Sequence, residues 1–392
     1  MMSPSPRHAL RIAISTLLVA MAAGCGGGKG DDAASAPTSS APSATGTAPP
    51  RVFVAGDSLA DVGTFGLKAT VQSASNPAVG YPLYPEIVAA DLGAGPLCNY
   101  FSSTDQVTFT THAGCTDFAV AGAQVVNPVT RGGTLLPFSL QRQLETAVSA
   151  NGGAWQAGDW IVIDAGADDA LGVAESYRGA STGDTASSAI YVALLGQQLS
   201  ASTIQQALAQ PDGGSVAAGL YMQQVAKTFW STVKANTLDK GATHVVLLEV
   251  PDLTLTPKFR GIVGEIAAAQ GAAAGTAFQL ALRQWVAGFN AELTTLVAGE
   301  SRVVVAPYFE DITAQATNPA AFGLTNVTDA SCPPSGDFHA CTDAALDAAP
   351  PPGLQPGWWK TWAFSDEFHP SPRGHALLAA TVERAVTAAG WR

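Results

Sequence analysis

The chain has 392 residues, 47% of them hydrophobic, which is enough for one large α/β domain or two small ones. Its 31 acidic residues outnumber 19 Lys and Arg, giving a formal net charge of −12. Nucleic acid is therefore not an expected partner, and tight adhesion to anionic lipid headgroups is disfavoured.

The first 24 residues are predicted to be a secretory signal peptide. Two basic residues, Arg7 and Arg11, precede an apolar run from Ile12 to Met21, and small residues follow it. The run is too short to span a bilayer. We therefore expect export to the periplasm, to the outer membrane as a lipoprotein, or out of the cell.

Cys25 follows this run in a pattern that resembles a bacterial lipobox, whose cysteine is lipidated and becomes the mature N-terminus. Ala22 stands where a leucine is more usual, so lipidation and simple cleavage both remain open. Residues 25–50 contain Gly, Ser, Ala, Pro and Thr and almost no large apolar side chain, which predicts a flexible linker. If Cys25 is lipidated, that linker tethers a folded domain over residues 51–392 to a membrane.

The other four cysteines form two pairs that are local in sequence. In an exported chain this even number favours disulfides, so we expect bonds between Cys98 and Cys115 and between Cys332 and Cys341. Four free thiols or a metal site are the alternatives. Zinc is not expected, because no C-x-x-C spacing or histidine cluster accompanies these cysteines. We expect neither a metal nor a cofactor.

Four apolar, β-branched segments predict buried parallel strands. They are RVFVAGDSLAD from Arg51, DWIVIDAG from Asp159, THVVLLEVPD from Thr243 and RVVVAPYFE from Arg302. Helices are predicted at about residues 216–235, 262–297 and 372–389, the last with Ser371 as N-cap and Pro372 at its first position. Strands alternating with helices predict a three-layer αβα sandwich around a mostly parallel sheet. Ligands bind such sheets at the carboxyl ends of the strands.

The segment over residues 172–214 has weak periodicity and lies between two predicted strands. The segment is equally compatible with a lid or specificity insertion and with a pair of peripheral helices.

Two short elements carry the residues that predict chemistry. Gly56-Asp57-Ser58-Leu59 places a serine hydroxyl at the end of the first strand, near backbone N–H groups that stabilise negative charge. Asp366-Glu367-Phe368-His369-Pro370 precedes the last helix, and an acid three residues before a histidine can hold its Nδ1–H. Each element alone is ordinary turn chemistry. Together they predict a triad of Ser58, His369 and Asp366.

These elements and three others resemble the SGNH/GDSL hydrolases, in particular their lecithinase, haemolysin and plant-lipase-like branch. The matching stretches are GDSLAD, D-x-x-H-P, DFAVAGA from Asp117, VPDLTLTP from Val250 and NPAAFGLTNVTDASC from Asn318. They cover about residues 52–375. The resemblance implies a flavodoxin-like αβα sandwich with Ser58 as nucleophile, His369 as base and Asp366 as its orienting acid.

The resemblance also implies an oxyanion hole made by the backbone N–H groups of Ser58 and Gly122 and a third donor in a G-x-N-D block. The matching segment reads Gly166-Ala167-Asp168-Asp169, so Asp168 replaces the asparagine. An ionised carboxylate cannot donate a hydrogen bond, and loss of one donor costs about 10² to 10³ in turnover. Asp168 is either kept neutral by burial and neighbouring acids, or turned away so that two backbone donors remain.

The implied activity is hydrolysis of carboxylic esters through an acyl-enzyme, on lipid-like acyl esters as a lipase, phospholipase or esterase. The alternatives are a carbohydrate O-acetylesterase, an acyltransferase, or a non-catalytic exported lipoprotein with an oxyanion hole weakened by Asp168. We expect a monomer whose partner is its ester substrate, with a membrane reached only through Cys25. Aromatic side chains before the acid are predicted to pack in the core, at Trp358 and Trp359, or to line an acyl pocket, at Trp362 and Phe364.

Overall fold

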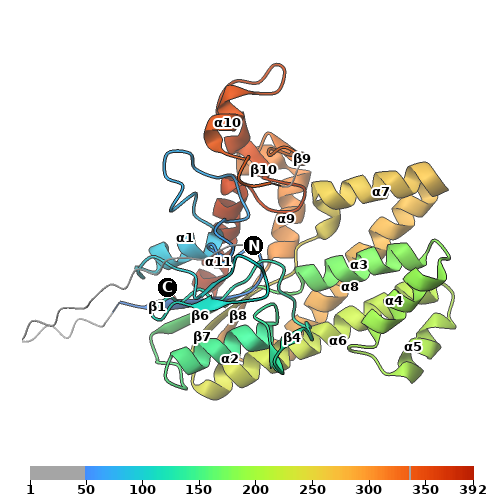
Figure 1. Ribbon diagram of the computed structural model, residues 1–392, viewed down its shortest axis with the longest axis horizontal. Helices are drawn as coiled ribbons and strands as arrows, with labels where there is room; N and C mark the ends of the chain where they lie inside the picture. The colour runs from blue at the N-terminus through green and yellow to red at the C-terminus, as the bar shows by residue number, and fades with distance from the viewer. Residues whose placement is uncertain (1–48, 335–336) are drawn as a thin grey trace, which may run out of the picture. The chain divides into compact units, whose positions relative to one another are not determined.

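Four parallel strands form the central sheet, as the apolar segments predict (Figure 1). They are β1 (Arg51–Ala55), β6 (Asp159–Ile163), β7 (His244–Leu248) and β8 (Val303–Ala306), hydrogen-bonded in that order. The register places Phe53 opposite Ile161, Ile161 opposite Val245, and Val245 opposite Val303. The carboxyl ends of all four strands therefore meet at one edge of the sheet.

The structure is a computed structural model that describes residues 49–334 and 337–392. The expected signal peptide over residues 1–24, with Cys25 and nearly all of the expected linker over residues 25–50, lies outside the described residues. Within the described residues, no helix is both long and apolar enough to cross a membrane.

Helices cover both faces of the sheet, because alternate strand residues point to opposite sides. One face packs against α2 (Leu140–Ala150), α6 (Gly213–Asn236) and α8 (Ala272–Val297). The other packs against α1 (Tyr84–Asp91), α9 (Tyr308–Thr317) and α11 (Pro372–Ala388). The first face is lined by Phe53, Ala55, Ile161, Ile163, Val245 and Leu247, and the second by Val52, Val54, Trp160, Val162, Val246 and Leu248. This is the predicted three-layer αβα sandwich, with a buried core on each side of the sheet.

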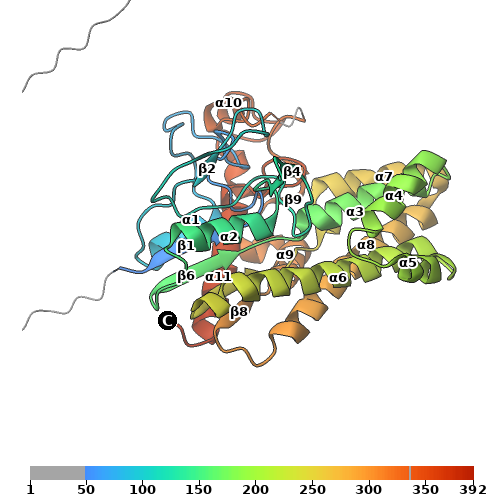
Figure 2. The same cartoon turned by 60° about the horizontal axis from the view of Figure 1, so that its bottom comes forward.

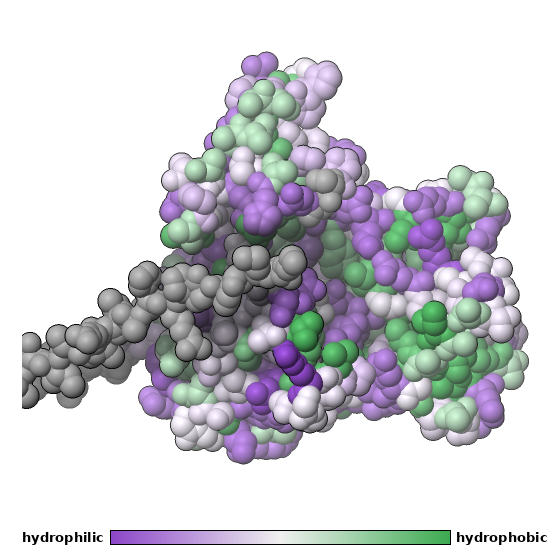
Figure 3. Space-filling view, viewed as in Figure 1, coloured by the Kyte–Doolittle hydropathy of each residue, from purple (hydrophilic) through white to green (hydrophobic). Residues whose placement is uncertain are grey.

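The remaining helices extend one end of the sandwich. Residues 172–214 complete α3 (Ala167–Ala180) and form α4 (Thr185–Leu195) and α5 (Ala201–Leu208), and Figure 2 shows α6 running from the sheet into this group. Side chains of α4 and α5 pack into the same core cluster as those of α6, namely Tyr191, Leu195, Ile204 and Ala207. Apolar side chains also remain exposed here, at Ile190, Val192 and Leu208, and Figure 3 shows a hydrophobic surface over these helices.

The helix predicted over residues 262–297 is two helices in the structure. α7 (Pro257–Gln270) ends at Gly271, whose φ of +95° is in the left-handed region that favours glycine, and α8 follows at once. The last predicted helix is α11, and the Ser371 Oγ accepts the N–H of Gly374 at 3.1 Å as an N-cap. One glycine therefore explains the wrong prediction, and the capping prediction is confirmed.

Three two-stranded sheets and one short helix lie outside the sandwich. β9 (Asn326–Ala330) pairs in parallel with β10 (Trp362–Phe364), and α10 is Asp343–Ala348. β2 (Phe101–Ser102) pairs antiparallel with β3 (Thr110–Thr111), and β4 (Thr130–Arg131) with β5 (Thr134–Leu135). Disulfides join Cys98 to Cys115 and Cys332 to Cys341, as predicted from the spacing of the cysteines.

Candidate active site

Ser58 lies on a tight turn directly after β1. The turn is fixed at Gly56, whose N–H donates to the Gln143 side-chain oxygen at 2.8 Å and whose carbonyl accepts from the Gln143 amide at 2.9 Å. A Cβ on Gly56 would lie 2.0 Å from an Asp164 carboxylate oxygen, so the backbone approaches that carboxylate as only glycine allows. That same oxygen accepts the N–H of Asp57 at 2.9 Å.

The structure brings the three predicted triad residues together. The His369 Nε2 lies 2.7 Å from the Ser58 Oγ, although the two residues are 311 positions apart. The His369 Nδ1 lies 2.8 Å from one oxygen of Asp366, whose other oxygen accepts the backbone N–H groups of Phe368 and His369. With Nδ1–H held by the carboxylate, Nε2 is the free acceptor for a serine proton.

Electrostatics favour a positive charge on this imidazole. Burial acts to lower the pKa of His369, but the Asp366 carboxylate and its hydrogen bond outweigh burial and leave the pKa raised. Burial acts to raise the pKa of Asp366, but the charge of His369 and the hydrogen bonds leave it lowered. Asp366 is therefore ionised at neutral pH and stabilises the imidazolium that forms when Ser58 gives up its proton.

Two backbone N–H groups, those of Ser58 and Gly122, are available to bind an anion. Across the described part of the chain, the N–H groups of Ser58 and Gly122 have no hydrogen-bond acceptor. Buried Asp61 ties their two turns together, since its carboxylate accepts the N–H of Ala121 at 2.8 Å and that of Thr64 at 2.7 Å. Free donors of this kind, held by neighbouring residues, are what an oxyanion hole requires.

Asp168 lies in the first turn of α3, close enough for its charge to interact with that of His369. Its Oδ2 is buried and has no hydrogen-bond partner among the described residues. Burial raises the pKa of Asp168 to about 6, Glu175 adds to this effect, and His369 and Lys258 oppose it. The side chain is not turned out to solvent, and its carboxyl group is neutral below about pH 6 and ionised above it.

Further buried acids lie beneath the nucleophile. Tyr84 donates its hydroxyl to Asp164 at 2.6 Å. Burial and the charges of Asp164 and Asp168 raise the pKa of Asp57 well above its ordinary value. Burial raises the pKa of Asp164 to about 6. Ser58 and His369 therefore lie close to several buried acids, whose ionised forms would stabilise an imidazolium and oppose an oxyanion.

The aromatic rings next to His369 are not those expected. Phe338 and Phe368 lie edge-on to His369, with ring centroids 5.9 Å and 5.5 Å away. Trp359 is buried and Trp358 packs against another ring, as predicted for both. Of the two rings expected to line an acyl pocket, Phe364 is buried and Trp362 lies against Trp358, with ring centroids 4.5 Å apart. The structure therefore places Trp362 and Phe364 in packing rather than beside His369.

Sequence reasoning missed several residues that shape the site. Asp164 ends the second predicted strand, so its place at the carboxyl edge of the sheet was visible in the pattern. Gln143 lies on the buried side of α2, where a polar side chain gives no signal of its target. Tyr84 and Phe338 are likewise placed by tertiary contacts alone.

A comparison with family models gives one match, described as GDSL-like Lipase/Acylhydrolase, over residues 52–382. The matched region begins in β1 and ends in α11, so it contains Ser58, Asp366 and His369. A comparison with curated proteins gives no match.

Proposed function

Because the chain belongs to the GDSL-like lipase/acylhydrolase family and is in general terms an ester hydrolase, we propose that Ser58 is its nucleophile. The observation that carries this proposal is the pair of hydrogen bonds from Ser58 through His369 to Asp366, at 2.7 Å and 2.8 Å. A serine hydroxyl is a weak nucleophile until a base lies within hydrogen-bond reach. The triad geometry supplies that base and the acid that orients it.

The reaction proceeds in two steps. The Ser58 Oγ attacks the ester carbonyl carbon while its proton passes to the His369 Nε2, giving a tetrahedral oxyanion. The oxyanion collapses, the C–O bond to the alcohol breaks, and His369 protonates the leaving alkoxide. Water, deprotonated by His369, then attacks the acyl-enzyme and releases the carboxylic acid and free Ser58. An alcohol that replaces this water makes the protein an acyltransferase.

The oxyanion is bound by the N–H groups of Ser58 and Gly122, with Asp168 as a third donor when it is protonated. The buried, unpartnered Oδ2 of Asp168 supports this role, because a buried carboxyl group without a partner is disfavoured as a carboxylate. As the pH rises through about 6, Asp168 loses its proton and opposes the oxyanion instead. The protein is therefore an esterase whose full oxyanion hole exists only below neutral pH.

Lipid-like acyl esters are the proposed substrates. The aromatic edges of Phe338 and Phe368 next to His369 support an apolar acyl group, although they do not distinguish it from a short acyl group on a carbohydrate. We place the protein outside the cytoplasm, as a monomer. Its two disulfides are compatible with an oxidising compartment.

One observation favours a second candidate, a non-catalytic exported lipoprotein. Above its pKa of about 6, Asp168 is a carboxylate at the position of an oxyanion donor, and such a charge opposes turnover. In this candidate the αβα sandwich is retained for ligand binding, and the triad no longer catalyses ester hydrolysis.

Labelling with a fluorophosphonate separates the two candidates, because only an activated serine displaces its fluoride. We expect one label per chain in the wild type and in Ser231→Ala, a matched change of an exposed serine on α6, and none in Ser58→Ala. A p-nitrophenyl ester panel from acetate to palmitate, with the same three proteins, then gives the acyl preference. Equal labelling of Ser58→Ala and wild type would refute the assignment of the nucleophile.

A further inference from the structure

The turn that carries the catalytic acid and base is anchored at Ser365, which is fully buried. The Ser365 N–H closes the turn by donating to the His369 carbonyl at 2.8 Å. The Ser365 carbonyl accepts the N–H of Cys332 at 2.6 Å, and the Ser365 Oγ accepts the N–H of Val71 at 3.0 Å. One residue next to Asp366 therefore binds two other segments of the chain.

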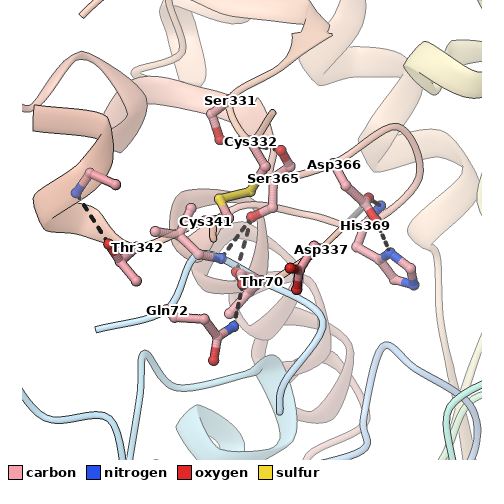
Figure 4. Close-up of a disulfide and its surroundings, with 12 residues drawn as sticks. Thr70, Gln72, Ser331, Cys332, Asp337, Cys341, Thr342, Ser365, Asp366 and His369 are labelled. Carbon is pink, nitrogen blue, oxygen red and sulfur yellow. Dashed lines mark hydrogen bonds and ion pairs between the residues drawn. A yellow bond between two sulfur atoms is a disulfide. The ribbon is translucent and has the colours of Figure 1, made fainter. Parts of the chain in front are cut away.

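The Cys332–Cys341 disulfide joins those two segments. Cys332 binds Ser365 directly, and the Cys341 carbonyl accepts the N–H of Gln72, the neighbour of Val71, at 2.8 Å. Three hydrogen bonds and one covalent bond thus close a ring around Ser365, which we call the clamp (Figure 4). In Figure 4 the disulfide lies beside Ser365, with Asp366 and His369 on the far side of the turn.

The clamp is reinforced on both sides of the turn. The Thr70 Oγ1 lies 3.2 Å from the Ser365 Oγ and donates to the Pro370 carbonyl at 3.1 Å. Val71 and both cysteines are buried in one small apolar cluster, so water does not compete for these hydrogen bonds. The turn is therefore held at its first residue and just after its histidine.

We propose that the Cys332–Cys341 disulfide is a redox-dependent positioning element for the catalytic turn. With the disulfide formed, the clamp holds the His369 Nε2 within 2.7 Å of the Ser58 Oγ. With it reduced, the segment bearing Cys341 separates from the one bearing Cys332, and the turn shifts. A misplacement of about 1 Å in a catalytic group costs about 10²-fold in rate. The inference rests on the proposed ester hydrolysis by Ser58.

The reduction is a thiol–disulfide exchange. A dithiol reductant gives two electrons and two protons to the disulfide, leaving two protein thiols and an oxidised, cyclic reductant. Exchange with oxidised glutathione reverses it. Because cytosolic thiols are kept reduced, the chain acquires full turnover only in an oxidising compartment.

The first test isolates this one disulfide. A full chain with Cys25→Ser, Cys98→Ser and Cys115→Ser keeps only the Cys332–Cys341 bond. We expect dithiothreitol to lower its kcat about 10²-fold with a smaller change in KM, and oxidised glutathione to restore it. The matched variant, with Cys332→Ser and Cys341→Ser and the other disulfide intact, is expected to have a low kcat that dithiothreitol does not change. An unchanged kcat on reduction, with free thiols confirmed by titration, overturns the proposal.

Ser365→Ala separates positioning from unfolding, because it leaves both disulfides intact. We expect kcat to fall severalfold at an unchanged fold by circular dichroism, and little further on reduction, since both changes break the same clamp. A kcat equal to that of wild type overturns the role of Ser365.

One readout needs no turnover. The Nδ1 proton of His369, identified by its loss in His369→Asn, gives a downfield NMR signal in the oxidised protein that weakens or shifts on reduction. A signal that is the same in both states overturns the proposal, even if the oxidised protein hydrolyses no ester. Absence of hydrolysis by the oxidised wild type, with the signal changing as expected, counts against the proposed function alone.

Discussion

Replacement of Asp168 by asparagine tests most directly whether Asp168 donates a hydrogen bond in the oxyanion hole. Asparagine supplies a neutral donor at every pH, whereas Asp168 donates only while protonated. Two pH units above its pKa of about 6, roughly one carboxyl group in a hundred carries its proton. Once the pH is high enough for His369 to be neutral, the wild-type kcat should fall about tenfold per pH unit, to a floor about 10² to 10³ below its maximum.

The ratio of the two kcat values should therefore depend on pH. We expect Asp168→Asn to match the wild type near pH 5 and to exceed it by about 10² near pH 8. The rising limbs of the two profiles should coincide near pH 5, because Asp168 is mostly protonated there and its charge does not raise the pKa of His369. Product chromatography on a short-chain ester from pH 5 to pH 9 measures both effects without a pH-sensitive chromophore.

A charge change outside the oxyanion hole provides the control. Glu175 raises the pKa of Asp168, so Glu175→Gln should move the falling limb to lower pH without removing a donor. Two results would refute the reasoning: a ratio that is constant across the range, or a kcat of Asp168→Asn well below wild type at every pH.

Three further changes test the surroundings of the site. Gly56→Ala should prevent folding or lower Tm sharply, because its Cβ meets Asp164, whereas Gly264→Ala in α7 has open space and should stabilise by about 1 kcal/mol in thermal melts. Gln143→Leu leaves the Gly56 N–H unpaired, although the Gly56 carbonyl still accepts the N–H of Val120, and this should cost about 1–3 kcal/mol in urea unfolding and lower kcat; wild-type values for both would contradict this. Burial raises the pKa of Asp164 to about 6 and that of Asp169 to about 7, so folding stability should be lost as pH rises through that range. Calorimetry should give a lower Tm at pH 8 than at pH 5, and the opposite order would contradict the assignment.

The sheet and the triad were predictable because their signals are local. The near-continuous apolar segments around Val54, Val162 and Val246 predict buried parallel strands, and strand topology then places Ser58 at the functional edge. The turn from Asp366 to His369 is equally local, since three residues separate the two side chains. The pairing of this turn with Ser58 depended on the family resemblance, because no pattern in either segment identifies a partner 311 residues away.

The supporting residues were not predictable, because their roles arise only from tertiary contacts. Gln143 is one polar residue on an apolar helix face, and its two bonds to Gly56 depend on how α2 meets β1. Phe338 lies between the two bonded cysteines in sequence, and its ring contact with His369 is a tertiary one that no local pattern indicates. The two helices joined at Gly271 show a smaller limit, since an Ala-rich segment favours helix on both sides of the break.

The proposed nucleophile, Ser58, follows the first strand of the sheet, and the proposed base, His369, precedes α11, which has a consequence for biogenesis. A growing chain exposes Ser58 early, but no base exists until synthesis passes residue 369 and α11 docks beside β8. Nascent chains and fragments cut before that turn therefore carry an inert serine. On the proposed mechanism, ester cleavage therefore begins only when the segment carrying Asp366 and His369 has been synthesised and has docked against the sheet.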